Sequence, residues 1–248
     1  MTTQVEPFVR FADVYDAIYT ARGKDYAAEA AFILDTVGAN GKHPPRSLLD
    51  VACGTGRHLE HFAKRLNVAG TDASAAMLAV AANALPGVPL QPADMRELDL
   101  GWTFDVVTCL FAAVAYLPTT ADLHRAVAAM ARHVAPGGTL VLHPGVTPGR
   151  LTSGQTVEVV APMPEGVVRR HARAKRDGDA LVITFDFEVE RRGKISSFTE
   201  VHRMSLFTDA EYRAAFAAVG MTAKHVEPWP GPRGVYFGRA QRVIGGVR

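Results

Sequence analysis

The sequence predicts an α/β fold built on a mostly parallel sheet, with a layer of antiparallel strands inserted late in the chain. Hydrophobic strands and amphipathic helices alternate between residues 26 and 145, which is typical of parallel strands joined by helical crossovers. From Val157 to Phe207 apolar residues occupy every second position instead, and turns separate these stretches. That change of period predicts antiparallel strands after the fifth strand of the parallel sheet.

The first long helix is expected to begin near Tyr26. Its apolar residues recur at helical spacing, and Gly38 suits a C-terminal cap. An aromatic segment precedes it, and its spacing fits either a lid over a site or an ordinary buried helix. We favour the lid, because tyrosine hydroxyls within an apolar face usually seek a defined partner. The aromatic residues are Phe8, Phe11, Tyr15 and Tyr19.

Residues 48–58 run from a hydrophobic strand through a glycine turn into an amphipathic helix. Glycine permits positive φ and close approach of a ligand, and a helix N-terminus directs unpaired N–H groups at it. Leu59, Phe62, Ala63 and Leu66 recur at helical spacing, and the next strand ends in Asp72. This strand–turn–helix–strand order predicts a nucleotide-binding site.

The residues around this turn indicate which nucleotide suits it, and Asp72 alone does not decide. Asp72 fits ribose hydroxyls in either NAD or S-adenosylmethionine. A pyrophosphate loop, however, reads G-x-G-x-x-G, and Leu59 stands where the third glycine would be. Asp50 precedes the turn, and a carboxylate there suits the ammonium of S-adenosylmethionine better than a diphosphate. The sequence therefore favours a methyl donor as cofactor.

The remaining strands follow in order. Residues 90–96 end a third strand with Asp94 and Met95, which suit an adenine amino group and ring face, although an ordinary loop is the alternative. Residues 104–111 form a buried fourth strand, and the turn at 136–138 leads into a fifth at 139–142. Thr208 and Glu211 form a capping box for a late helix that Gly220 ends, and residues 235–237 form the last strand.

The inserted layer contains a hairpin whose charges permit two interpretations. Residues 169–175 place basic side chains on one strand face, residues 177–179 turn the chain, and acidic residues alternate along 186–190. The basic face could hold a sugar-nucleotide diphosphate, or the opposite charges could pair across the strands as surface pairs. We favour surface pairing.

Composition limits the possible partners. A chain of 248 residues with 48% hydrophobic content suits one domain over residues 1–248, and a net charge of +2 without a basic block argues against nucleic acid. Neither a signal peptide nor a membrane-spanning apolar run is expected, so we expect a cytoplasmic protein acting on a small molecule. Cys53 and Cys109 provide neither a disulfide framework nor metal-ligand spacing, and no metal is expected. Both are interpreted as core residues, with a nucleophilic Cys53 as the weaker alternative.

The motifs together resemble those of the class I S-adenosylmethionine-dependent methyltransferases. The matching segments are residues 50–56, Asp72, residues 94–95, 104–111 and 136–138. A narrower resemblance, to the amino-sugar N-methyltransferases of antibiotic biosynthesis (desosamine and mycaminose N,N-dimethyltransferase type), covers nearly the whole chain. It is carried by residues 15–19, 23–26, 51–56, 94–96, 176–180, 201–203, 206–207 and 231–234.

The resemblance implies a Rossmann-like seven-stranded methyltransferase sheet whose last strand runs antiparallel beside the fifth. It implies an N-terminal lid over residues 1–26, an antiparallel substrate-side layer over residues 147–207, and a homo-oligomer, dimer or larger. The cofactor-binding residues it implies are Tyr15, Tyr26, Asp50, Ala52, Cys53, Gly54, Gly56, Asp72, Ala73, Asp94, Met95 and Phe111. The substrate-binding residues it implies are Phe8, Phe11, Tyr19 and Tyr116.

We expect a neutral amine to meet the sulfonium methyl in line, with orientation and water exclusion providing most of the acceleration. Tyr116, Tyr15 and His143 are the catalytic candidates. The similar enzymes carry histidine at the place of Tyr116, which leaves base catalysis open. Phe11 replaces a tyrosine of the lid, and residues 143–148 lack an expected aromatic pair. His58 and His61 are expected to be ordinary loop and helix residues.

The sequence thus predicts an S-adenosylmethionine-dependent N-methyltransferase of a small natural-product amine. The leading acceptor is an amino sugar or its nucleotide-linked precursor. A lincosamide-type antibiotic precursor is the alternative acceptor. A non-catalytic regulator that binds S-adenosylmethionine is the alternative of another class.

Overall fold

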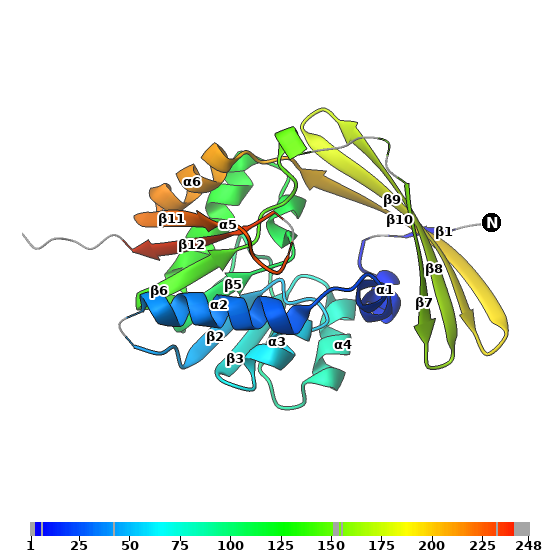
Figure 1. Ribbon diagram of the computed structural model, residues 1–248, viewed down its shortest axis with the longest axis horizontal. Helices are drawn as coiled ribbons and strands as arrows, with labels where there is room; N and C mark the ends of the chain where they lie inside the picture. The colour runs from blue at the N-terminus through cyan, green and yellow to red at the C-terminus, as the bar shows by residue number, and fades with distance from the viewer. Residues whose placement is uncertain are drawn as a thin grey trace, which may run out of the picture.

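The computed structural model describes residues 3–5, 7–41, 43–150, 154, 156–231 and 233–240, and contains two sheets (Figure 1). The larger sheet has seven strands in the order β11-β12-β6-β5-β2-β3-β4. Their bounds are β2 (Ser47–Val51), β3 (Asn67–Asp72), β4 (Leu90–Pro92), β5 (Phe104–Cys109), β6 (Val134–Leu142), β11 (Met221–Val226) and β12 (Val235–Ala240). The predicted seven-stranded sheet is confirmed, including the antiparallel last strand β12 beside β6.

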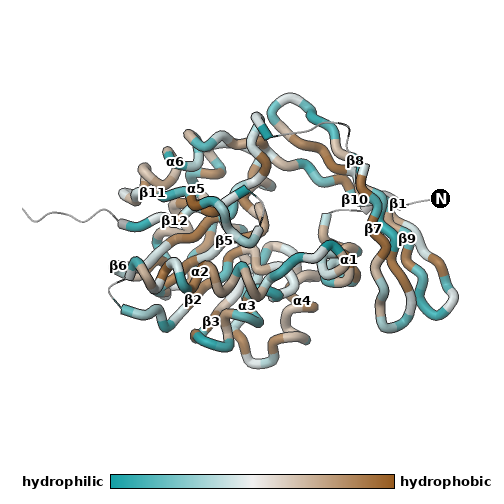
Figure 2. Tube along the Cα trace, in the orientation of Figure 1, coloured by the Kyte–Doolittle hydropathy of each residue, from teal (hydrophilic) through white to brown (hydrophobic). Residues whose placement is uncertain are grey.

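Helices cover both faces of this sheet because its strands alternate apolar side chains between two cores. Leu48 of β2 packs with α2, α3 and α4, whereas the next residue, Leu49, packs with α5 and α6. Figure 2 shows hydrophobic residues along the central strands of the sheet, between the helical layers. The helices are α2 (Tyr26–Asn40), α3 (Arg57–Phe62), α4 (Ala75–Ala84), α5 (Thr120–Arg132) and α6 (Asp209–Ala218). Within the part of the chain that the structure describes, no helix combines the length and apolar character needed to span a bilayer.

Several element boundaries differ from the sequence-based expectation. Helix α2 continues through Gly38 to Asn40, whose side-chain amide donates to the Thr36 carbonyl, and Gly41 follows as the cap. Helix α3 ends at Phe62 rather than extending to Leu66, and the Arg65 and Leu66 N–H groups close turns onto the Phe62 carbonyl. Strand β6 begins before the turn at 136–138, and an irregularity in its pairing with β5 accommodates that turn.

The second sheet is the inserted layer, in the order β1-β10-β9-β8-β7. Antiparallel strands β7 (Thr156–Met163), β8 (Gly166–Asp177), β9 (Ala180–Arg191) and β10 (Lys194–Ser205) confirm the predicted layer. Arg173 of β8 contacts Asp186 of β9 at 2.7 Å, and Arg169 lies 4.0 Å from Glu188, so the hairpin charges do pair across the strands. Strand β1 (Thr3–Val5), which was not predicted, pairs parallel to β10.

The N-terminal aromatic segment lies between the two sheets and packs on the smaller one. Phe11 and Val14 of the 3-10 turn η1 (Phe11–Val14) and Ile18 of α1 (Tyr15–Ala21) share one apolar cluster with Val168 and Phe187 of the inserted strands. Figure 1 shows α1 between the large sheet and strands β7 and β8. Residues 1, 2 and 6 of the expected lid, residues 151–153 and 155 of the expected inserted segment, and Pro232 lie outside the described residues.

Helix α6 begins with the predicted capping box, so its stability should depend on Thr208. The Thr208 hydroxyl accepts from the Glu211 backbone N–H, while the Glu211 carboxylate accepts from the Thr208 backbone N–H at 2.8 Å. Thr208→Ala should lower the free energy of unfolding by about 1 kcal/mol, because a helix N–H loses its acceptor. Urea unfolding would measure this, with exposed Thr222→Ala on β11 as control. Equal stabilities of the two variants would contradict the capping account.

Candidate functional site

A cavity of about 1710 Å³ lies at the C-terminal edge of the large sheet, between that edge and the inserted layer. The loops after β2, β3, β4 and β5 form one wall, and residues of β8, β9 and β10 form the opposite wall, with α1 and the chain before it alongside. Ligands of open α/β sheets bind outside the carboxyl ends of the strands. The fold therefore places the cavity where a nucleotide-binding sheet holds its ligand.

The glycine turn after β2 is shaped for a ligand. Gly54 has φ +58°, and a Cβ added there would meet no atom within 4 Å, so its backbone borders open space in the cavity. Gly56 has φ +80°, and an added Cβ would lie 2.7 Å from the Leu85 side chain, so this glycine permits close packing of the loop against α4. Left-handed backbone and close approach are the two properties for which glycine is needed here.

Asp72 ends β3 beside that turn and lines the cavity. One carboxylate oxygen accepts from the Gly54 N–H and the other from the Ser74 N–H, each at 2.8 Å. Burial raises the pKa of Asp72, while these backbone donors act in the opposite direction. A carboxylate has about four acceptor positions, so Asp72 keeps lone pairs for two ligand hydroxyls. This arrangement fits a ribose.

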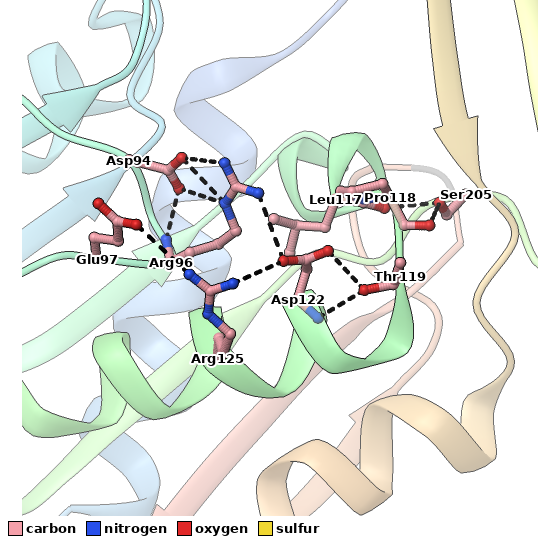
Figure 3. Close-up of polar contacts among 9 residues, drawn as sticks. All are labelled: Asp94, Arg96, Glu97, Leu117, Pro118, Thr119, Asp122, Arg125 and Ser205. Carbon is pink, nitrogen blue, oxygen red and sulfur yellow. Dashed lines mark hydrogen bonds and ion pairs between the residues drawn. The ribbon is translucent and has the colours of Figure 1, made fainter.

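Asp94 and Met95 line the same wall after β4. Arg96 donates from Nε to the Asp94 carboxylate at 3.0 Å and holds the pKa of that carboxyl below its usual value. Figure 3 shows this guanidinium between Asp94 and Asp122 of α5, with Arg125 joining Asp122 to Glu97. The network fixes an ionised acceptor and an apolar side chain side by side, which suits the amino group and ring of adenine.

Asp50 does not have the position expected of an ammonium ligand. Its carboxylate points toward the neighbouring strand β5, accepts from the Thr108 hydroxyl at 2.6 Å, and does not line the cavity. Burial raises its pKa to about 7, with the Thr108 hydrogen bond acting in the opposite direction. The direct pairing predicted from the sequence is thus replaced by a buried hydrogen bond, because the side chain projects sideways between two strands.

Asp50→Asn should change how stability depends on pH. A buried carboxyl whose folded pKa is about 7 and whose unfolded value is 3.8 contributes stability below the lower value and loses it as the pH rises through the higher. Relative to Asp50→Asn, the cofactor-free wild type should lose on the order of 4 kcal/mol between pH 4 and pH 8. Urea unfolding across that pH range would test this prediction. If the free energies of unfolding of the wild type and Asp50→Asn change with pH in parallel, the prediction is wrong.

The structure divides the other predicted site residues into two groups. Ala52, Ala73 and five aromatic residues line the cavity, and the Tyr19 and Phe111 rings meet edge to face at 4.7 Å. The aromatic residues of this group are Phe8, Tyr15, Tyr19, Phe111 and Tyr116. The residues that do not line the cavity are Phe11, Tyr26, Cys53, Gly56 and His143.

Each residue of the second group has a different place in the fold. Phe11 belongs to the apolar cluster on the inserted layer, and its ring lies 4.9 Å from that of Phe187. Cys53 is a free thiol in the core between the large sheet and helices α2, α3 and α4, and Tyr26 packs edge to face on His58. His143 is fully buried with its ring 4.7 Å from Trp229, and it does not line the cavity that Tyr116 lines.

Tyr116 has a buried histidine behind it, which the sequence alone did not reveal. Its hydroxyl lies 2.6 Å from Nδ1 of His202, and Nε2 of that ring lies 3.1 Å from the Glu200 carboxylate. Tyr116 ends the 3-10 turn η2 (Ala113–Tyr116) after β5, whereas His202 and Glu200 belong to β10. Only the resemblance around residues 201–203 pointed to this segment.

A buried charge cluster beside the cavity was also missed. Glu29 of α2 accepts from the Lys24 ammonium through one oxygen and lies 2.8 Å from Nε2 of His58 through the other. All three side chains are at most 7% exposed, so His58 is not the ordinary loop residue that was expected but a buried residue of α3. Lys24 and Glu29 line the cavity, and the Lys24 ammonium lies 4.3 Å from the centre of the Phe111 ring.

Comparison with known proteins agrees with this site. Residues 48–138 match the methyltransferase domain family. The chain is 42% identical to the dTDP-3-amino-3,4,6-trideoxy-alpha-D-glucopyranose N,N-dimethyltransferase of Streptomyces venezuelae, over 93% of this chain and 98% of that protein. It is also 42% identical to the dTDP-4-amino-2,3,4,6-tetradeoxy-D-glucose N,N-dimethyltransferase of Saccharopolyspora spinosa, over 92% and 91%.

A solved structure agrees with the fold and with the cofactor. CalS10 with bound S-adenosylmethionine, an amino pentose methyltransferase from Micromonospora echinaspora, has a TM-score of 0.82 and 43% identity, covering 91% of this chain and 95% of that one. The predicted cofactor, S-adenosylmethionine, and the predicted enzyme class are confirmed, which excludes the non-catalytic regulator. The chain belongs to the S-adenosylmethionine-dependent amino-sugar N-methyltransferases.

Proposed function

We propose that this enzyme transfers two methyl groups, one after the other, to the amine of a nucleotide-linked amino sugar in antibiotic biosynthesis. The size of the cavity carries the proposal. Pockets for one small ligand measure roughly 300–1,000 Å³, and this cavity of about 1710 Å³ has room for the cofactor and a second, nucleotide-sized ligand together. The relatives named above act on amino sugars linked to dTDP.

Unpaired cations favour a nucleotide-linked acceptor over a free sugar. Lys24 and Arg203 line the cavity but pair with Glu29 and Asp177. Arg22 and Arg233 also line it, and neither forms an ion pair within the described residues. Guanidinium groups suit phosphate oxygens because their fork of donors matches them. We therefore assign these two arginines to the diphosphate.

The amine of the acceptor is proposed to bind between the aromatic side chains that line the cavity. When bound, S-adenosylmethionine supplies an electrophilic methyl group. Phe8, Tyr15 and Tyr19 enclose the region with Tyr116, which keeps water away and restricts the amine to approaches in line with that methyl. We also propose that residues 1–26 form a lid over the site and that the enzyme is a homo-oligomer, as the resemblance implies. A cytoplasmic location, expected from the sequence, completes the proposal.

The test compares one amino sugar with and without its nucleotide. Labelled S-adenosylmethionine would be incubated with the enzyme and either a dTDP-linked 3-amino sugar or the free sugar. We expect kcat/KM to fall by at least 100-fold without the nucleotide, since about 3 kcal/mol of charged phosphate contacts is lost. Arg22→Ala should reduce the difference in kcat/KM between the nucleotide-linked and the free sugar. Replacement of the exposed Arg132 by alanine should leave that difference unchanged. Equal turnover of both sugars would contradict the assignment.

A further inference from the structure

A chain of hydrogen bonds runs from the cavity into the protein interior through three side chains. Tyr116 lines the cavity, and its hydroxyl lies 2.6 Å from Nδ1 of His202. Nε2 of His202 lies 3.1 Å from Oε2 of Glu200, and neither His202 nor Glu200 has any exposed surface. The chain therefore has one end at the cavity and one at a buried carboxylate.

The partners of Glu200 determine where the protons lie. Its carboxylate accepts from the backbone N–H groups of Phe8, Arg10 and Phe11, at 2.9, 3.2 and 3.0 Å. A carboxylate that receives only N–H donors is an acceptor in each of these bonds, so Nε2 of His202 carries the proton shared with it. In the neutral imidazole Nδ1 then holds a lone pair, and the Tyr116 hydroxyl donates to it. The network assigns this tautomer.

We propose that His202 is a positioning residue that takes up the acceptor's proton through Tyr116, while Glu200 holds the imidazole in the receptive tautomer. The inference rests on the proposed methylation of an amine. The ammonium of the acceptor gives a proton to the Tyr116 oxygen as the Tyr116 proton passes to Nδ1 of His202. The freed nitrogen lone pair then forms the C–N bond, the C–S bond breaks, and its electron pair stays on sulfur. The proton on His202 returns through Tyr116 to water after the product leaves.

The reaction needs such a proton acceptor. An aliphatic ammonium has a pKa of about 10.4 in water, so the acceptor enters protonated at neutral pH and has no lone pair. Burial raises the pKa of Tyr116 above its ordinary value, so tyrosinate alone is scarce. The other titratable groups that bear on this hydroxyl are Glu200, which is engaged by N–H donors, and Tyr15 and Tyr19 of α1, which are phenols. The imidazole is the base that this site holds.

The first test uses no acceptor. Nitrogen NMR of the ¹⁵N-histidine-labelled full chain, compared with the spectrum of His202→Asn, would identify the two ring nitrogens of His202. We expect a neutral ring with its proton on Nε2, and a shift of the Nδ1 signal in Tyr116→Phe, where the donor is lost. A proton on Nδ1, or no effect of Tyr116→Phe, would overturn the proposal.

The second test separates proton uptake from packing. Asparagine at position 202 can keep an acceptor oxygen for Tyr116 but cannot take a proton. His202→Asn should lower kcat for the nucleotide-linked amino sugar about 100-fold at pH 7 with little change in KM. The loss should shrink toward pH 10, where solvent deprotonates the amine. Tyr116→Phe should show the same dependence of kcat on pH, and it provides the test if His202→Asn fails to fold.

His133→Asn is the matched control. His133 is also a buried histidine, but its ring bonds to the Leu100 N–H and the Ala129 carbonyl. It lies where β5 and β6 begin, whereas Tyr116 follows the end of β5. The substitution should lower stability without changing kcat or the pH profile. If kcat falls by the same factor at every pH in both His202→Asn and Tyr116→Phe, the proposed proton transfer through Tyr116 to His202 is overturned. The NMR experiment locates the proton on His202 without any acceptor, so it tests the further inference alone. A wild-type enzyme that is inactive on the amino sugar would contradict the proposed function instead.

Discussion

Asp72→Ala should weaken S-adenosylmethionine binding by at least 100-fold. Asp72 lines the cavity and is the expected ligand of the ribose hydroxyls, and its carboxylate also holds the Gly54 and Ser74 N–H groups at 2.8 Å. Losing two hydrogen bonds to a charged group costs about 3 kcal/mol or more, and each 1.4 kcal/mol is tenfold in affinity. Calorimetric titration with the cofactor would measure the change.

The control for this variant is Asp35→Ala. Asp35 lies on the exposed side of α2, 73% exposed and 3.6 Å from Arg65, so its removal should leave affinity unchanged. Thermal unfolding of both variants would show that the fold persists. Affinity of Asp72→Ala within twofold of the wild type would contradict the placement of the ribose.

Glu29→Ala should lower the free energy of unfolding by about 3–5 kcal/mol, because it leaves the buried Lys24 ammonium without its carboxylate. Burial alone would raise the pKa of Glu29, but His58 and Lys24 together bring it below its ordinary value. The cluster thus depends on the carboxylate being present and charged. Urea unfolding at neutral pH would measure the loss.

Glu60→Ala is the matched comparison on neighbouring α3. Glu60 pairs with Arg57 at 2.7 Å, but both side chains are more than a third exposed, so this change should cost less than about 1 kcal/mol. A similarly small loss in Glu29→Ala would show that the buried cluster does not stabilise the fold.

The parts of this enzyme that local sequence predicts are those whose structure depends on neighbours along the chain. The strand before the glycine turn, the turn itself and the acid that ends β3 all follow from period and from the conformational freedom of glycine, and Asp72 lies where it was expected. The capping box of α6 is equally local, because Thr208 and Glu211 are three residues apart.

The parts that could not be predicted depend on partners far along the chain. Tyr116 and His202 are 86 residues apart, and Glu200 receives N–H groups about 190 residues away. Periodicity indicates which face of a strand is buried but not what it meets there. The same limit explains Asp50, whose side chain turns toward Thr108 of a neighbouring strand and does not line the cavity.

If the cavity holds the cofactor and a nucleotide-linked amino sugar together, the enzyme should methylate the amine of that sugar, and analysis of the products would show it. The enzyme would be given S-adenosylmethionine with a dTDP-linked 3-amino sugar or with an N-demethyl lincosamide, and the products identified by mass and NMR. We expect the sugar amine to gain two methyl groups, through a detectable monomethyl intermediate, and the lincosamide to stay unchanged. Methylation of the lincosamide with none of the sugar would contradict the account.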